Sequence, residues 1–221
     1  MNATAAPGYE TQIQSLRIDG VEFRIRTLID RQQYYDPDGS AEGAGISSAT
    51  WPLFGMLWPA GLALAEEMSR FPIEGKRILE VGCGTGLSSL VLRKRGADIT
   101  ASDHHPLAGE FLNANAELNG LPPLNFAQAQ WQGPNPHLGE FDLIVGSDVL
   151  YERDHPALLA GFLAAHAKAS ACVVIADPGR EHRGRFGALM IGQGYVRTER
   201  KFRKAGKEED SRGRIMIFTR D

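Results

Sequence analysis

The stretch RILEVGCGTGLS, residues 77–88, decides how the rest of the chain is interpreted. It joins an apolar run, which contains the acidic residue Glu80, to a turn with glycines at alternate positions, Gly82, Gly84 and Gly86. A short apolar run before a turn is typical of a buried strand, and the segment after the turn has helical spacing. Strand, glycine turn and helix in this order predict a loop that holds a nucleotide-type cofactor.

Outward from this stretch, predicted strands and helices alternate along the chain. After the strand at 77–81 we expect strands at 97–103, 124–130, 141–147 and 171–177, and helices at about 59–70, 86–95, 106–119, 154–169 and 182–192. This alternation predicts an α/β fold with a mostly parallel sheet and helices on both of its faces. The last two strands, 195–202 and 213–220, have no helix between them, so they predict an antiparallel hairpin at the end of the sheet.

The N-terminal part lies outside this repeating pattern. Two runs that alternate apolar and polar residues flank Asp19-Gly20, which predicts a β-hairpin that serves as an accessory cover. Residues 36–50 have the composition of a turn or linker with little to bury, and we expect them to be mobile without a ligand. The predicted division is a tail, hairpin and linker over 1–50 and one domain over 51–221.

Length and composition exclude several classes of protein. The 221 residues suffice for one domain with a sizeable core, and 43% hydrophobic and 23% charged residues are globular values. A net charge of −3 argues against a nucleic-acid partner. No apolar run approaches the roughly 20 residues of a membrane span, and the first residues do not resemble a signal peptide. Two isolated cysteines, Cys83 and Cys172, predict a reduced, cytoplasmic protein.

The residues around the glycine turn discriminate among cofactors. Asp103 follows Gly82 by 21 positions, at the tip of the next strand, where a ribose hydroxyl pair would be held. A dinucleotide-binding turn needs Gly or Ala where this chain has Leu87, and the Gly-Lys-Ser/Thr of a triphosphate-binding loop is absent. The turn therefore disfavours NAD, FAD and nucleoside triphosphates.

Six motifs then carry a resemblance over residues 51–177. They are LWPAG (57–61), ILEVGCGTGL (78–87), ASD (101–103), NAELNG (115–120), AQW (129–131) and FDLIVGSDVLY (141–151). In this order they resemble the class I, seven-strand S-adenosylmethionine-dependent methyltransferases, and within them the METTL21-like protein lysine methyltransferases. The resemblance implies a Rossmann-like sheet of seven strands, with S-adenosylmethionine as cofactor and S-adenosylhomocysteine as product.

The resemblance also implies a set of cofactor-binding residues. Asp103 would take the ribose hydroxyls, Trp131 would lie against the adenine and Trp58 would close over the methionine side. A carboxylate suits two hydroxyl donors, and an indole offers a flat apolar face. For Trp58 a purely structural role as a core anchor stays open. The full implied set is Trp58, Glu80, Gly82, Gly84, Gly86, Asp103, Trp131 and Ser147.

A second site follows from Asp148 and Tyr151, at the switch in strand order where open α/β sheets bind ligands. In the resembled enzymes an Asp-x-x-Tyr at this place lines the entry of the target amine, so the resemblance makes these two residues catalytic. Methyl transfer needs an unprotonated nucleophile in line with the methyl group, and exclusion of water. The structural alternative is that Asp148 caps the next helix and Tyr151 packs.

Three further groups of polar residues have weaker interpretations. A basic cluster, residues 180–185, either starts a solvated helix or meets an acidic stretch of a partner. His104 and His105 lack further metal ligands at a recognisable spacing, so a loop pair is favoured and no metal is expected. Cys83 has no indicated His partner, which disfavours a nucleophilic thiol.

The sequence thus predicts a methyltransferase that acts on a protein amine such as a lysine side chain. A small-molecule N-methyltransferase, a non-catalytic S-adenosylmethionine-binding module and an NAD-binding oxidoreductase remain alternatives. No nucleic acid or membrane partner is expected, and a monomer is compatible with the sequence.

Overall fold

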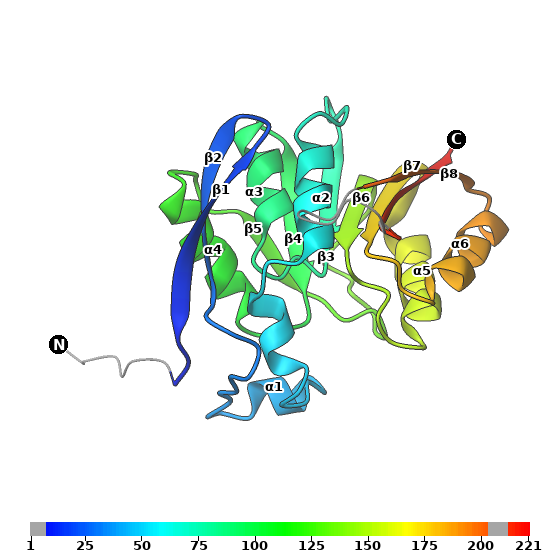
Figure 1. Cartoon of the computed structure of the whole chain (residues 1–221). Coiled ribbons are helices and arrows are strands. Elements are labelled where there is room, and N and C mark those ends of the chain that lie inside the picture. Colours follow the sequence, from blue (N-terminus) through cyan, green and yellow to red (C-terminus); the bar gives the residue numbers. More distant parts are fainter. Residues whose placement is uncertain (1–7, 203–211) are drawn as a thin grey trace.

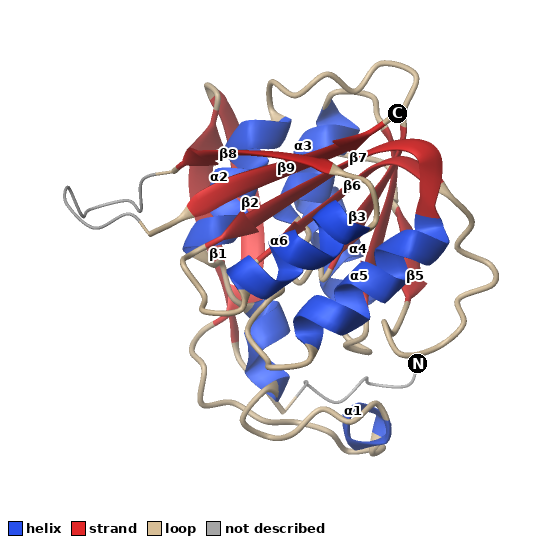
Figure 2. Cartoon of the chain, turned by 90° about the vertical axis from the view of Figure 1, so that its right-hand side faces the viewer, coloured by secondary structure: helices blue, strands red, loops and turns tan. Residues whose placement is uncertain are grey.

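The computed structural model describes residues 8–202 and 212–221 as a twisted sheet with helices on both faces (Figures 1 and 2). The sheet has seven strands in the order β5-β4-β3-β6-β7-β9-β8. Their bounds are β3 Arg77–Val81, β4 Asp98–Asp103, β5 Asn125–Gln128, β6 Phe141–Ser147, β7 Ala167–Asp177, β8 Val196–Lys201 and β9 Arg214–Arg220. The predicted Rossmann-like seven-stranded fold is confirmed.

The first five strands of this sheet are parallel, and β9 runs antiparallel to both of its neighbours, β7 and β8. The predicted C-terminal antiparallel hairpin is therefore confirmed, although most of its connection, residues 203–211, lies outside the described residues. Because β3 and β6 are neighbours with crossovers leaving in opposite directions, their carboxyl ends form the switch point where such sheets bind ligands.

Alternate residues of the central strands enter two separate cores. On one face, Ile78 packs with residues of α2 (Pro59–Met68), α3 (Leu87–Lys94) and α4 (Ala108–Leu118). On the other face, Leu79 packs with residues of α5 (His155–His166) and α6 (Arg183–Gly192). A strand buried on both faces is largely apolar, which explains the apolar run before the glycine turn; Glu80 is the buried exception within it.

The largest error in the predicted boundaries lies between α5 and β7, while the other elements differ from their predicted bounds by at most two residues at an end. The alanine-rich stretch predicted a helix to residue 169, but α5 ends at His166 and β7 begins at Ala167. Ala167 pairs with Phe141 across a register irregularity, and the Lys168 ammonium lies 2.8 Å from the carboxylate of Asp142. Pairing with β6 thus overrides the local helix propensity of the alanines.

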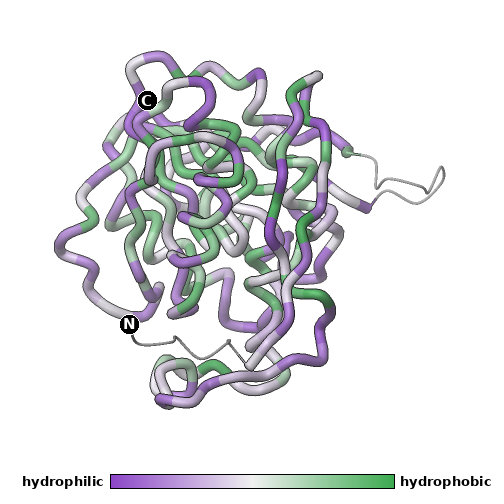
Figure 3. Tube along the Cα trace, turned by 90° about the vertical axis from the view of Figure 1, so that its left-hand side faces the viewer, coloured by the Kyte–Doolittle hydropathy of each residue, from purple (hydrophilic) through white to green (hydrophobic). Residues whose placement is uncertain are grey.

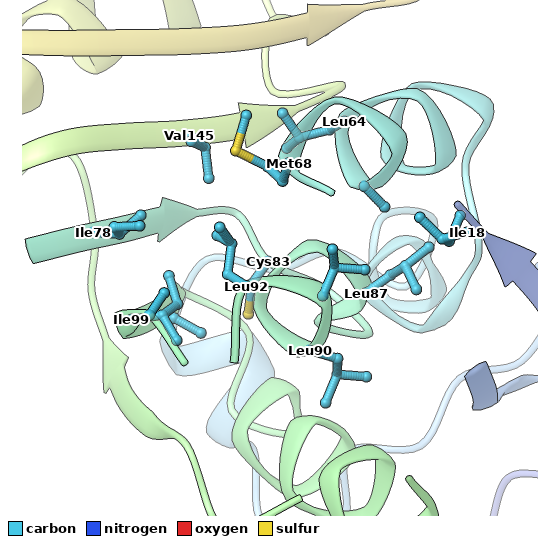
Figure 4. Close-up of a cluster of buried hydrophobic side chains, with 14 of the residues drawn as sticks. Ile18, Leu64, Met68, Ile78, Cys83, Leu87, Leu90, Leu92, Ile99 and Val145 are labelled. Atoms are coloured by element: carbon cyan, nitrogen blue, oxygen red, sulfur yellow. The ribbon is translucent and has the colours of Figure 1, made fainter. Parts of the chain in front are cut away.

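The predicted N-terminal hairpin is confirmed as β1 (Thr11–Ile18) and β2 (Val21–Leu28). Its turn residues, Asp19 and Gly20, both have positive φ, 47° and 82°, as a two-residue hairpin turn requires. Polar and apolar residues follow one another along its strands (Figure 3), and Ile18, with two other hairpin side chains, enters the core beside Leu87 of α3 (Figure 4). The hairpin therefore contributes to the main core.

The expectation that residues 36–50 have little to bury holds for most of this segment, in which only Ala41 and Ile46 are buried. Ala41, in the short helix α1 (Ser40–Gly43), and Ile46 are buried in a third apolar cluster around Trp51. The carboxylate of Asp36 accepts hydrogen bonds from two backbone amides of this turn. The segment continues into the 3-10 helix Trp51–Gly55, at the bottom of the molecule in Figure 1. Whether this segment moves without a ligand stays a prediction.

No helix among residues 8–202 and 212–221 is long and apolar enough to span a bilayer.

Candidate functional site

The glycine loop lies at the carboxyl end of β3 and has a backbone that requires glycine. Gly84 and Gly86 have φ of 53° and 80°, in the left-handed region. A Cβ at Gly84 would lie 2.7 Å from the carbonyl oxygen of Phe54, and one at Gly86 would lie 2.3 Å from Cδ1 of Leu112. The loop is therefore packed closely between the 3-10 helix and α4.

Asp103 fixes one peptide of this loop from the tip of β4. Its Oδ2 accepts a hydrogen bond from the Gly84 amide at 2.9 Å, and its Oδ1 accepts one from the His105 amide at 2.9 Å. Burial acts to raise the pKa of Asp103, but hydrogen bonds from His104 and the two amides outweigh it and the pKa is lowered. A carboxylate has about four acceptor positions and these three donors occupy three of them, so Asp103 keeps capacity for one further hydroxyl donor.

Glu80 faces α3. Its Oε2 accepts hydrogen bonds from the amide and the hydroxyl of Ser89, at 2.9 and 2.5 Å. Burial raises its pKa to about 7, against the lowering effect of these bonds. This geometry gives Glu80 a structural part, because it ties β3 to the helix that follows the loop, while a direct cofactor contact stays a prediction.

Trp58 directly precedes α2, and Ser147, at the end of β6, lies against the first turn of α2. The Trp58 ring is half-buried, donates from Nε1 to the Leu53 carbonyl at 2.9 Å and has the Arg31 guanidinium 5.8 Å from its centroid. The Ser147 hydroxyl, at the end of β6, lies 3.5 Å from where a Cβ on Gly61 would be. Trp58 is thus anchored by its indole nitrogen and keeps part of its surface exposed.

Asp148 follows β6 in a strained conformation, with φ of 54°. Its amide bonds to the Ala176 carbonyl at 2.9 Å, and its carboxylate accepts from Nε of Arg180 at 2.8 Å. The alternative that Asp148 caps the next helix is wrong, because the N-cap position of α5 is Asp154. Asp148 is nearly buried, with 9% of its side chain exposed, and it is paired with a cation.

Arg180 is itself held in place by Asp177, at the end of β7. Oδ1 of Asp177 accepts from the amides of Gly179 and Arg180, both at 2.8 Å, while its Oδ2 is buried without a hydrogen-bond partner. Burial raises the pKa of Asp177. Two other arginines of the basic cluster, Arg183 and Arg185, donate to backbone carbonyls, so the cluster makes internal contacts.

Tyr151 meets a residue that the sequence did not single out, His155. The two rings pack edge to face at 4.5 Å between centroids, and the other neighbour of His155 is Trp131, at 5.3 Å. Nδ1 of His155 lies 3.0 Å from the Val149 carbonyl, and since a carbonyl only accepts, Nδ1 carries the proton. His155 lies four residues after Tyr151, at the first residue of α5, and no sequence pattern singled it out.

Burial affects the protonation of both rings. It raises the pKa of Tyr151 to about 12, so this phenol stays neutral at physiological pH. It lowers the pKa of His155, which favours a neutral imidazole whose Nε2 is free of a proton. The contacts of His155 thus join Trp131, which is predicted to lie against the adenine, to Tyr151, which is predicted to line the amine entry, through uncharged rings.

The two predicted halves of the site are in contact. A Cβ on Gly82 would lie 2.9 Å from Cγ1 of Val149, which is the residue between Asp148 and Leu150. The glycine loop and the Asp-x-x-Tyr segment therefore pack directly on each other, as adjacent strand ends require.

The remaining candidates have structural surroundings. Cys83 is buried, which raises its pKa well above the ordinary value and keeps the thiol protonated. His105 stacks on Phe54 at 3.7 Å, and its Nδ1 accepts from the Leu107 amide. Within the described part of the chain, no three His, Cys, Asp or Glu residues come together as a metal site.

A seven-stranded sheet with β9 reversed, a glycine loop on β3 and an acidic residue at the tip of β4 define the class of Rossmann-like methyltransferase domains. The chain belongs to this group: the family model described as "Methyltransferase domain" matches residues 60–219.

Among curated proteins, the chain is similar to the electron transfer flavoprotein beta subunit lysine methyltransferase of Xenopus laevis, with 34% identity over 163 residues, 72% of this chain and 63% of that protein. It is 37% identical over 126 residues to protein N-lysine methyltransferase METTL21A of Danio rerio, which is 51% of this chain and 56% of that protein. The chain thus spans less than two thirds of the length of these relatives.

Among solved structures, the 16S rRNA N2 G1207 methyltransferase RsmC of T. thermophilus aligns over 100% of this chain and 53% of its own, with a TM-score of 0.67 and 16% identity. This similarity supports the fold.

Proposed function

We propose that the chain is an S-adenosylmethionine-dependent methyltransferase that N-methylates a lysine side chain of a protein. One observation carries the proposal: the contact between Gly82 and Val149, which joins a glycine loop and an Asp-x-x-Tyr segment into one site. The relatives support the acceptor class, since the electron transfer flavoprotein beta subunit, METTL21A and EEF1A enzymes are all named lysine methyltransferases.

The residues of the glycine loop fit the proposed cofactor. A Cβ at Gly82, Gly84 or Gly86 would meet Val149, Phe54 or Leu112. Glycine at these positions therefore lets the loop keep the tight shape that we propose for cofactor binding. Ionised Asp103 beside the loop has acceptor capacity left for one ribose hydroxyl, and Trp131 offers an indole face on the side of β5. S-adenosylmethionine supplies an electrophilic methyl group when bound.

The acceptor half would align the amine and exclude water. The attacking nitrogen must be unprotonated; it forms the new bond to the methyl carbon while the sulfur takes the electron pair of the broken bond, and the amine proton leaves to solvent. Tyr151, neutral with a pKa of about 12, offers a hydroxyl and a ring face rather than a base.

Asp148 would orient the amine from within its ion pair. Arg180 places a positive charge 2.8 Å from this carboxylate, which leaves the pair close to neutral overall. A neutral pair does not hold an ammonium ion as strongly as a lone carboxylate, and this favours the free amine that the reaction needs. We also propose a cytoplasmic location and the 1–50 and 51–221 division on sequence grounds alone.

The acceptor can be tested with a purified candidate. The chain is incubated with methyl-labelled S-adenosylmethionine and, in parallel, with purified electron transfer flavoprotein or a cell extract, and methyl-lysine is sought by peptide mass spectrometry. Methyl-lysine on the flavoprotein or on another extract protein supports the proposal. Label confined to small molecules, or NADH binding without S-adenosylhomocysteine binding, contradicts it.

The proposed acceptor residues need their own control. Asp148→Ala and Tyr151→Ala should abolish most transfer while S-adenosylhomocysteine binding persists. Unaltered transfer in both variants would remove these residues from the site.

A further inference from the structure

The motif NAELNG places two asparagines one turn apart on α4, Asn115 and Asn119, facing the free edge of β2. Asn119 accepts from the Arg24 amide at 2.9 Å and donates to the Arg24 carbonyl at 2.7 Å. Asn115 makes the same two bonds with Arg26: it accepts from the Arg26 amide at 2.6 Å and donates to the Arg26 carbonyl at 3.3 Å. A side-chain amide carries the same donor and acceptor as a peptide group, so the two asparagines replace a neighbouring strand.

Only Asn115 also reaches the glycine loop. Its Nδ2 donates to the carbonyl of Thr85 at 2.9 Å, whereas the second bond of Asn119 ends on the carbonyl of Asn115 within α4. Asn115 has no exposed surface, and Thr85 is 4% exposed. One buried side chain thus touches both the hairpin and the loop.

This bond completes the fixing of a loop peptide. The Thr85 carbonyl is held by Asn115, and the amide of the same peptide, Gly86 N–H, donates to the Cys83 carbonyl at 2.8 Å. A peptide bonded at both ends cannot rotate without breaking a buried hydrogen bond.

Other contacts hold the hairpin against α4 at the same level. The Arg26 guanidinium lies 4.6 Å from the Phe111 ring centroid and pairs with Glu110 at 3.2 Å. Because these contacts involve the residue whose backbone Asn115 binds, a shift of the hairpin at Arg26 moves Asn115 as well.

We propose that Asn115 is a positioning residue through which the N-terminal hairpin holds the glycine loop in its cofactor-binding shape. The inference rests on the proposed function, because it assumes that the loop binds S-adenosylmethionine. It assigns to β1 and β2 a part in cofactor affinity, although they contribute no residue to the proposed site.

The test compares Asn115→Ala with Asn119→Ala, its matched control. Each variant removes one equivalent pair of bonds to the backbone of β2, at Arg26 or at Arg24. Only Asn115→Ala also removes the bond to Thr85. Binding of S-adenosylhomocysteine by calorimetry is expected to weaken about 10-fold in Asn115→Ala, as loss of one buried bond allows, and to stay within about 2-fold in Asn119→Ala. Equal binding losses in both variants, or none in Asn115→Ala, would overturn the inference.

A measurement on the unmodified chain covers the case that Asn115→Ala does not fold. Coupling between sites is reciprocal, so ligand binding at the loop must stabilise the hairpin contact. Saturation with S-adenosylhomocysteine should slow hydrogen exchange of the Arg26 amide, which Asn115 holds, more than that of the Arg24 amide. Unchanged exchange at Arg26 contradicts the inference alone, whereas a chain that binds no S-adenosylhomocysteine contradicts the proposed function.

Discussion

The cofactor half and the acceptor half of the site are built in different ways. At the ends of β3 and β4, backbone peptides are held by the buried side chains of Asp103 and Asn115. At the ends of β6 and β7, the key contact is a side-chain ion pair, and Arg180 has 41% of its side chain exposed. The first half is set by backbone geometry, while the second depends on side chains that can rearrange around different acceptors.

The sharpest way to break the cofactor half is Gly84→Ala. The new Cβ would meet the backbone oxygen of Phe54 at 2.7 Å, and neither backbone can yield cheaply. We expect S-adenosylhomocysteine affinity to fall by about 100-fold or more, since a displacement of about 1 Å costs that much at a preorganised site.

Gly96→Ala is the matched control for this variant. Gly96 also has a positive φ, 81°, but a Cβ there meets nothing within 4 Å. The Gly96→Ala variant should lose about 1–2 kcal/mol of stability, because alanine is disfavoured in the left-handed conformation, and should keep its affinity for S-adenosylhomocysteine. Equal affinity losses in both variants would show that backbone strain, and not the packing of the loop, is responsible.

Glu80→Gln tests whether the buried carboxyl group of Glu80, in the cofactor half, makes the stability of the chain depend on pH. The pKa of Glu80 in the folded chain, about 7, lies above its ordinary value of 4.5, so the stability that protonated Glu80 contributes is complete below pH 4.5 and lost as pH rises to about 7. Relative to the unmodified chain, the free energy of unfolding of Glu80→Gln should therefore rise between pH 5 and pH 8, by at most about 3 kcal/mol. Urea titrations at both pH values measure this, and a constant difference would contradict the raised pKa.

Arg180→Gln breaks the acceptor half alone. Without the guanidinium, Asp148 loses its 2.8 Å partner and its orientation, and we expect kcat/KM for the acceptor to fall about 10-fold with S-adenosylhomocysteine affinity unchanged. Arg185→Gln, in the same basic cluster but bonded to the Arg153 carbonyl, should leave both quantities unchanged. A loss of cofactor affinity in Arg180→Gln would mean that the two halves are not separable.

His155→Phe should have the smallest effect. The change keeps the ring packing against Tyr151 and Trp131 but removes the hydrogen bond to the Val149 carbonyl. We expect kcat/KM to fall about 3-fold, which is less than the loss of a fully buried hydrogen bond would cause. His166→Phe, which loses a similar bond to Gly139 at the other end of α5, is the control. Equal effects of both changes would assign His155 a purely structural part.

The same contrast explains what could be predicted from the sequence. The glycine turn, the strand alternation and the terminal hairpin follow from local patterns, and all are confirmed by the fold. The pairing of Asp148 with Arg180, the ring contact of His155 with Trp131 and the packing of Ile46 in a cluster with Phe111 join segments far apart in the chain, so no local pattern indicates them. The predicted end of α5 was wrong for the same reason, because the pairing of Ala167 with Phe141 of β6 ends the helix.

The central claim, transfer of a methyl group to a protein lysine, is tested most directly by following the label. The chain is incubated with methyl-labelled S-adenosylmethionine and a cell extract, and labelled protein is hydrolysed to amino acids. We predict label in methyl-lysine, lost with Asp148→Ala but not with Arg185→Gln. Label that appears only in the small-molecule fraction, or in no product at all, would contradict the account.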